Sequence, residues 1–244
     1  LPMSAAALPG LAEQYVNKPA GVKQFVLDNI GTRRDNDGNL IWAVQIGGIH
    51  NDGARSLIID DNGDIKLVGY FQSTVDFDPD PIDSVMLVGP ANGNWGNEAF
   101  ILKLTGNGDF VWVRHIESNG PQGMIHFRAA EEGIDDNFVV TGSLGSLISN
   151  DPVNFDPNSV SGYWISPVAA FDVILAEYDA DGNLLNFASY PGSTGLFGGI
   201  FGVTDLAFDN QGNLYMASSL VDTIDIHPDP NIIVPLYPQG GQDI

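Results

Sequence analysis

The chain repeats itself along its length. Residues 39–42, 109–112 and 183–186 carry similar motifs that lie 70 and 74 residues apart, and each motif follows a turn that contains glycine. Self-similarity at a nearly fixed interval is typical of repeat architectures, in which every copy forms one supersecondary unit. A unit of about 70 residues therefore recurs about three times within the 244 residues.

Two further motif series interleave with the first in a fixed order. An Asp-rich turn occurs at 60–65 and 209–214, and a less regular copy occupies 133–138. A motif that ends in proline occurs at 76–79, 154–157 and 225–228. Because the three series keep the same order, the repeat extends over whole units and is not confined to isolated turns.

The segments between the turns have the composition of β-strands. Runs such as 65–70 (Ile-Lys-Leu-Val-Gly-Tyr) and 110–113 (Phe-Val-Trp-Val) are short and rich in β-branched and aromatic residues. Asp-Gly and Asn-Gly between such runs indicate hairpins, because Gly and Asn tolerate a positive φ. Each unit should then hold four antiparallel strands, like one blade of a β-propeller. We predict an all-β fold, a β-propeller or partial propeller with about three blades.

The phase of the repeat divides the chain into blades. It assigns 54–116 and 127–190 to whole blades, and 22–47 and 203–244 to half blades that could pair with each other. Residues 1–21 are predicted to be an N-terminal extension or linker. Because closed propellers usually have about four to eight blades, we expect either a fragment of a longer protein or a chain that completes a ring with another chain. The fragment is the favoured interpretation.

Three stretches carry a family resemblance. Residues 68–79, 99–109 and 209–218 resemble SBBP-type bacterial β-propeller repeats, of the variety found in secreted and surface proteins of Bacteroidota. The resemblance covers roughly residues 22–244. It implies a propeller in a large secreted protein, often with several domains and a type IX secretion signal, and therefore an extracellular or cell-surface location. It implies no particular activity.

The charge balance excludes several classes of partner. Asp and Glu total 31 against 9 Lys and Arg, which gives a net charge of −22. So few cations cannot form the basic face that nucleic acids require, and an anionic membrane surface would repel the chain. There is no apolar run long enough for a transmembrane helix, so we expect no membrane insertion. Cysteine is absent, which excludes disulfides and thiolate metal sites.

The proline-terminated motifs are candidate calcium sites. In an extended chain Asp76, Asp78 and Asp80 would share one face, and nearby carboxylates repel unless a cation neutralises them. Calcium takes six to eight hard oxygen ligands and is the natural candidate. The alternative is a turn in which the Asp side chains accept backbone N–H bonds. With the equivalent positions of the other two units, the predicted ligands are Asp76, Asp78, Asp80, Asn154, Asp156, Asp225 and Asp229.

No motif in the sequence specifies a catalytic reaction. The four histidines lack the spacing of a zinc protease, and no serine lies in a nucleophile-elbow motif. Carboxylates are so abundant that any chosen pair is uninformative. We therefore expect a non-catalytic module for binding, adhesion or display, with a protein or glycan partner at the cell surface. The alternative is a secreted polysaccharide hydrolase or lyase with carboxylates in the propeller channel.

Overall fold

A computed structural model describes part of the chain, and every regular element among the described residues is a β-strand. These residues are 29–90, 96–120, 123–145, 150–168, 170–192, 200–220, 223–227, 232–237 and 239–240. They form eighteen strands and no helix, which confirms the predicted all-β class. Within them no helix long and apolar enough to cross a membrane is found. The predicted extension, 1–21, lies outside the described residues.

Two four-stranded antiparallel sheets have the same strand order. The first sheet runs β3-β4-β7-β8 and the second β9-β10-β13-β14 along the chain. The first contains β3 (Gly53–Ile59), β4 (Ile65–Phe71), β7 (Glu98–Leu104) and β8 (Phe110–Ile116). The second contains β9 (Met124–Glu132), β10 (Phe138–Gly145), β13 (Phe171–Tyr178) and β14 (Leu184–Pro191). These are the four-stranded antiparallel sheets expected from the repeat.

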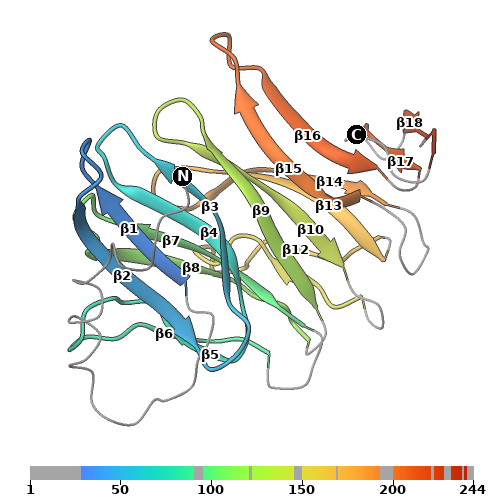
Figure 1. The fold of residues 1–244 in the computed structure, drawn as a ribbon. Coiled ribbons are helices and arrows are strands. Elements are labelled where there is room, and N and C mark those ends of the chain that lie inside the picture. The colour runs from blue at the N-terminus through green and yellow to red at the C-terminus, as the bar shows by residue number, and fades with distance from the viewer. Residues whose placement is uncertain are drawn as a thin grey trace.

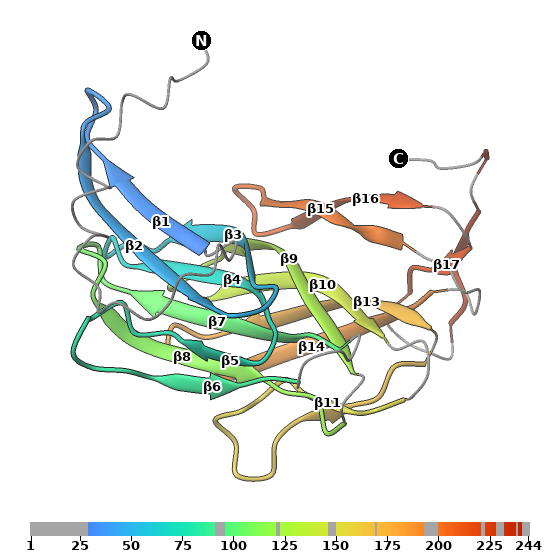
Figure 2. The same ribbon diagram turned by 60° about the horizontal axis from the view of Figure 1, so that its bottom comes forward.

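Two strand pairs, each half of a unit, lie at opposite ends of the row of sheets (Figures 1 and 2). The pair β1 (Asn29–Arg34) and β2 (Leu40–Gly48) precedes the first complete sheet. The pair β15 (Ile200–Phe208) and β16 (Leu214–Leu220) follows the second. By their place in the repeat, β1 and β2 correspond to the third and fourth strands of a unit, and β15 and β16 to the first and second.

A small hairpin follows the second strand of each unit. The three hairpins are β5–β6 (Thr74–Asp76, Met86–Val88), β11–β12 (Val153–Asn154, Trp164–Ile165) and β17–β18 (Ile224–Asp225, Pro235–Leu236). Strand β5 pairs with β2 of the preceding unit, which gives the sheet order β1-β2-β5-β6. In the same way Val153 bridges to Ser118, beyond the end of β8. Each hairpin therefore binds its unit to the preceding one.

The first strands of successive units pack against one another. Strand β9 contacts β3 on one side and β15 on the other, and Figure 1 shows the three strands following each other across the molecule. Apolar cores fill the space between consecutive sheets. One core joins the first two complete sheets, through residues such as Val68, Ile101, Ile125 and Phe127. Another joins β1-β2-β5 to the first complete sheet, through Ile46, Val75, Phe77 and Phe100.

Two tryptophans at equivalent positions, Trp42 in β2 and Trp112 in β8, pack against the following unit. The indole N–H of Trp42 donates to the carbonyl oxygen of Gly106 at 3.1 Å. The ring of Trp112 lies against Gly182, where an added Cβ would be 3.0 Å from it. Both glycines belong to the turn between the third and fourth strands of the next unit.

The hairpin turns share one hydrogen-bonding pattern. In the turn after β3 the Asp60 carboxylate accepts from the backbone N–H of Asn62 and Asp64, at 3.1 and 2.9 Å. Gly63 has a φ of 84°, which an L-residue rarely adopts. The same capping occurs at Asp35, Thr105, Asp179 and Asp209. These loops are therefore turns, as predicted, and their acidic residues serve the backbone.

Candidate functional site

The predicted calcium ligands lie in the small hairpins, where the first residue of each motif has an identical role. Asp76 Oδ1 accepts from the backbone N–H groups of Asp78 and Val85, at 3.1 and 2.9 Å. Asn154 Oδ1 accepts at the same spacing from Asp156 and Tyr163, and Asp225 Oδ1 accepts from His227 and Val234. An amide oxygen serves as well as a carboxylate here, so this position closes the hairpin loop in all three units.

The three carboxylates of the first motif, Asp76, Asp78 and Asp80, all accept backbone N–H groups, as in the turn that the sequence analysis gave as the alternative. Strand β5 ends at Asp76. The next two carboxylates each accept from the backbone N–H two residues further along the chain: Asp78 from Asp80 at 2.9 Å, and Asp80 from Ile82 at 2.7 Å. Within the described ranges, no three His, Asp or Glu side chains are placed together to hold a metal ion.

One predicted ligand has an unused oxygen. Asp156 Oδ1 is buried and receives no hydrogen bond from the described part of the chain. Asp229 lies outside the described residues. Calcium binding therefore stays a prediction, with the second unit as its best-placed site.

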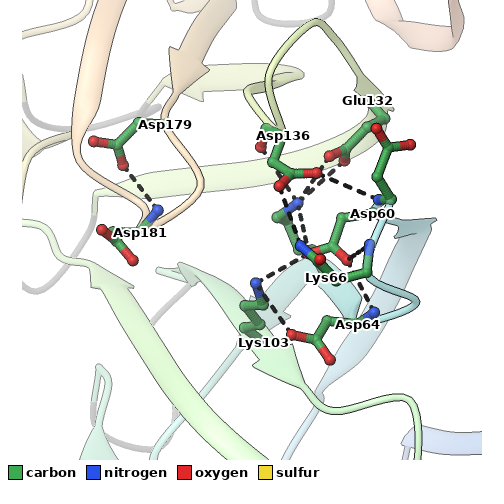
Figure 3. Close-up of polar contacts among 10 residues, drawn as sticks. Asp60, Asp64, Lys66, Lys103, Glu132, Asp136, Asp179 and Asp181 are labelled. Carbon is green, nitrogen blue, oxygen red and sulfur yellow. Dashed lines mark hydrogen bonds and ion pairs between the residues drawn. The ribbon is translucent and has the colours of Figure 1, made fainter.

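A charged network lies where the first two complete sheets meet, at the end that carries the β3–β4 and β9–β10 turns (Figure 3). Lys66, on β4, is fully buried, and its Nζ lies 3.0 and 3.2 Å from the Glu132 carboxylate oxygens on β9. It also lies 3.5 Å from Asp60 Oδ2 and 3.4 Å from the carbonyl oxygen of Asp136. Lys103, on β7, approaches the same Asp60 oxygen to 3.0 Å. The network thus joins β4, β7 and the turn between β3 and β4 to the next unit.

Burial and pairing act against each other in this network. Burial alone would raise the pKa of Asp60, but hydrogen bonds from Lys103 and the N–H of Asp64 hold that pKa below its ordinary value. At Glu132, by contrast, burial has the larger effect, and the pKa is raised although Lys66 lies beside it. The pKa of Lys103 is raised by its acidic neighbours in spite of partial burial. The network therefore works as a connection between sheets held by opposite charges.

The irregular middle turn completes the network. Asp135 and Asp136 both have a positive φ, 58° and 60°, in the place where the other turns carry glycine. This geometry brings the Asp136 carboxylate to the backbone N–H of Asp61 and the side-chain amide of Asn62, each at 3.3 Å. The departure from the repeat at 133–138 thus provides a contact between neighbouring turns.

An apolar core that includes Val139, Val173 and Leu206 joins the second complete sheet to the β15–β16 pair, and a groove opens along this boundary at the same end. Its volume is about 480 Å³. The walls combine apolar and acidic side chains from the turns and strands on either side: Glu132, Ile134, Phe138, Glu177, Phe208 and Gln211 among others. Unlike the neighbouring boundary, this one has no buried lysine among its described lining residues.

A second polar cluster lies near the other end of the same strands. His115 contacts the Glu98 carboxylate, which also accepts from the backbone N–H of Ser118 at 3.2 Å. His126, on β9, contacts the side-chain amide of Asn97 and packs against the Tyr70 ring, with the ring centres 4.9 Å apart. The sequence indicated neither of these clusters. For the charged network around Lys66, the sequence offered one signal: lysines at 66 and 103 inside otherwise apolar strand segments.

Comparisons with known proteins add little to the geometry. No family model matches the chain, and no curated protein matches it. Among solved structures, a protein of unknown function from Bacteroides caccae is similar at 13% sequence identity. The match covers 83% of this chain and 66% of that protein, with a TM-score of 0.29. A likeness at this level does not indicate a function or a family.

Proposed function

We propose that the sheets are blades of a β-propeller of the SBBP-repeat type. The shared strand order of the two complete sheets supports this arrangement, and so does the packing of β9 between β3 and β15. In a propeller the first strand of every blade lies next to the axis, so first strands of successive blades would meet in this way. Another chain or a further segment would supply the remaining blades.

The module that these blades form is a non-catalytic one for binding, adhesion or display at the cell surface or outside the cell. The observation that carries this proposal is an exposed aliphatic side chain in the same loop of each unit. Ile82 is 90% exposed, Val160 is fully exposed and Ile233 is 75% exposed. Single exposed apolar residues are common, but their recurrence at equivalent loops of a rigid scaffold favours a contact surface for a partner.

Retention on immobilised probes tests the function directly. Pectin, alginate, chitin, collagen and fibronectin would serve as probes, with albumin as the blank. The variant Ile82→Asp/Val160→Asp/Ile233→Asp should lose retention, whereas Ile134→Asp, at a 70% exposed turn position, should keep it. Equal retention of both variants would contradict the loop surface. Release of reducing ends or unsaturated sugars from the polysaccharides would instead establish the hydrolase or lyase alternative.

Calcium is a further part of the proposal. Its support is the buried Asp156 Oδ1, which lacks a donor among the described residues and which a hard cation would satisfy. Backbone carbonyls of the same loop could complete the oxygen ligands that calcium needs. A calcium ion there would stiffen the loop that carries Val160.

A further inference from the structure

We propose that Arg55 and Arg128 form an oxyanion-binding site on the first strands of the two complete sheets. The site would take the carboxylate, sulfate or phosphate group of a ligand. This inference deepens the proposed binding function, on which it rests, because it names the charged group that the module would recognise.

Both arginines occupy β-bulges at equivalent positions. On β3 the register passes from Ala54 to Ser56, so that Arg55 is the extra residue. On β9 the register passes from Phe127 to Ala129, so that Arg128 is the extra residue. Bulges re-aim side chains and are common beside functional sites. The repeat thus delivers an arginine from each of two adjacent first strands.

Glycines opposite the bulges show how closely the strands approach there. A Cβ at Gly69 would lie 2.1 Å from the carbonyl oxygen of Gly53, and a Cβ at Gly142 would lie 2.0 Å from that of His126. No side chain fits at either position without a backbone shift. The bulge geometry is therefore fixed by the backbone in both units.

Contacts connect the two strands at this point. The Arg55 guanidinium lies 5.0 Å from the centre of the Tyr70 ring and donates to the Tyr70 hydroxyl at 3.3 Å. The Tyr70 ring packs on His126, which precedes Arg128 by two residues on β9. Arg55 is exposed and Arg128 is half-buried, so the cluster is open to solvent on the Arg55 side.

The cluster is cationic and lacks a counter-ion. Among the described residues no carboxylate forms an ion pair with Arg55 or Arg128. Burial, together with the charges of Arg128 and Arg55, lowers the pKa of His126 to about 4. Arg33, Arg34 and Arg114 also form no ion pair among the described residues, but each donates to a backbone carbonyl, and no such bond is found for Arg55 or Arg128.

Buried polar atoms around the cluster also lack partners. Arg128 Nε is buried and donates no hydrogen bond within the described structure. Asn97 is 8% exposed, touches His126, and its Oδ1 receives no hydrogen bond from the described residues. Unpaired buried polar groups are costly unless a ligand satisfies them, and guanidinium groups match oxyanions with paired N–H donors.

The remaining arginines have partners of a different kind. Arg33 donates to the carbonyl of Gly106 at 2.7 Å, and Arg34 to that of Gly38 at 2.9 Å. Arg114 also has a buried Nε without a partner, but its Nη2 donates to the Asp181 carbonyl at 2.7 Å and Asp181 and Asp179 act on its charge. These three therefore serve the hairpin turns, and they provide matched controls.

Calorimetric titration with sodium glucuronate, sulfate and phosphate, each at constant ionic strength, tests the site. We expect one-to-one binding of at least one probe, and the probe that binds best identifies the source of the oxyanion. Arg55→Gln and Arg128→Gln should each weaken binding at least tenfold, while Arg34→Gln, with the same change of net charge, should change it less than twofold. Failure of all three probes to bind, or equal weakening by Arg34→Gln, would overturn the proposal.

If the arginine variants do not fold, NMR spectroscopy on the unaltered protein still tests the site. The chain has five arginines, so ¹⁵N-labelled protein gives few Nε–H signals. The oxyanion should shift those of Arg55 and Arg128 and leave those of Arg33 and Arg34 in place; uniform or absent shifts would contradict the site. Retention of Arg128→Gln on the immobilised probes at the wild-type level would leave the binding module standing and remove only this site.

Discussion

Replacing Lys66 by Met would remove a buried charge while nearly preserving the length of the side chain. The ammonium is fully buried and contacts both oxygens of Glu132, within 3.2 Å, and Asp60 Oδ2 at 3.5 Å. Without it, Asp60 keeps Lys103 at 3.0 Å, whereas Glu132 loses its ion-pair partner. The variant thus separates the contribution of the inter-sheet pair from that of the pair within one sheet.

The size of the effect follows from the burial of each partner. Removing one member of a fully buried pair typically costs about 3 to 5 kcal/mol, because the other charge is left uncompensated. The Glu132 side chain is 22% exposed, so water stabilises part of the remaining charge. We therefore expect a loss of about 2 to 3 kcal/mol for Lys66→Met. For Lys103→Met, which leaves Asp60 paired with Lys66, we expect about 1 kcal/mol.

Urea denaturation of a double-mutant cycle measures the effect. Lys66→Met, Glu132→Gln and their combination should show a coupling energy of about 1 to 2 kcal/mol, because the two side chains are in direct contact. Lys103→Met combined with Glu132→Gln should be nearly additive. A loss below about 1 kcal/mol for Lys66→Met, or additivity with Glu132→Gln, would refute the view that this pair holds the two sheets together.

Three other properties can be measured on the same material. The pKa of His126 is about 4 when folded and 6.5 when exposed, so the unfolded state binds the proton first as the pH falls. The free energy of unfolding should therefore drop between pH 6.5 and 4, by up to about 3 kcal/mol, and His126→Gln should flatten this part of the profile in urea titrations; an unchanged slope would contradict it. Gly69→Ala and Gly142→Ala should each cost about 2 to 3 kcal/mol in thermal unfolding, because the added carbon meets a backbone carbonyl, whereas Gly133→Ala should cost much less. EGTA should lower the melting temperature of the wild type by several degrees but not that of Asp156→Asn; identical melts with and without EGTA, and no metal in elemental analysis, would exclude calcium.

Local patterns predicted the parts of the fold that depend on near neighbours in sequence. The turn around Asp60 and Gly63 is set by contacts two to four residues apart, so its type follows from the residues themselves. The four-stranded sheets follow from the repeat, because strands joined by short turns pair with each other. The pairing of Val75 with Gly48 was not predicted, since a strand of three residues that joins another unit leaves no periodic pattern.

The charged sites show the limits of sequence reasoning more clearly. Lys66 and Glu132 are 66 residues apart, and no spacing rule indicates that they meet. The alternation rule assumed a strand that continued through Asp78, whereas the strand ends at Asp76, whose carboxylate accepts from the N–H of Asp78. The bulge at Arg128 exists only in the pairing with the neighbouring strand. Such features depend on register and on the packing of units.

The joint between the two complete sheets differs in its composition from the joint between the second of them and the β15–β16 pair. The first joint contains a buried lysine with carboxylates on both sides, whereas the second combines a small apolar core with a groove of about 480 Å³. If tension were applied along the row of sheets, separation would start at the groove and leave the first two complete sheets as one unit. Under such a load the chain would lose its β15–β16 end before its complete sheets come apart individually.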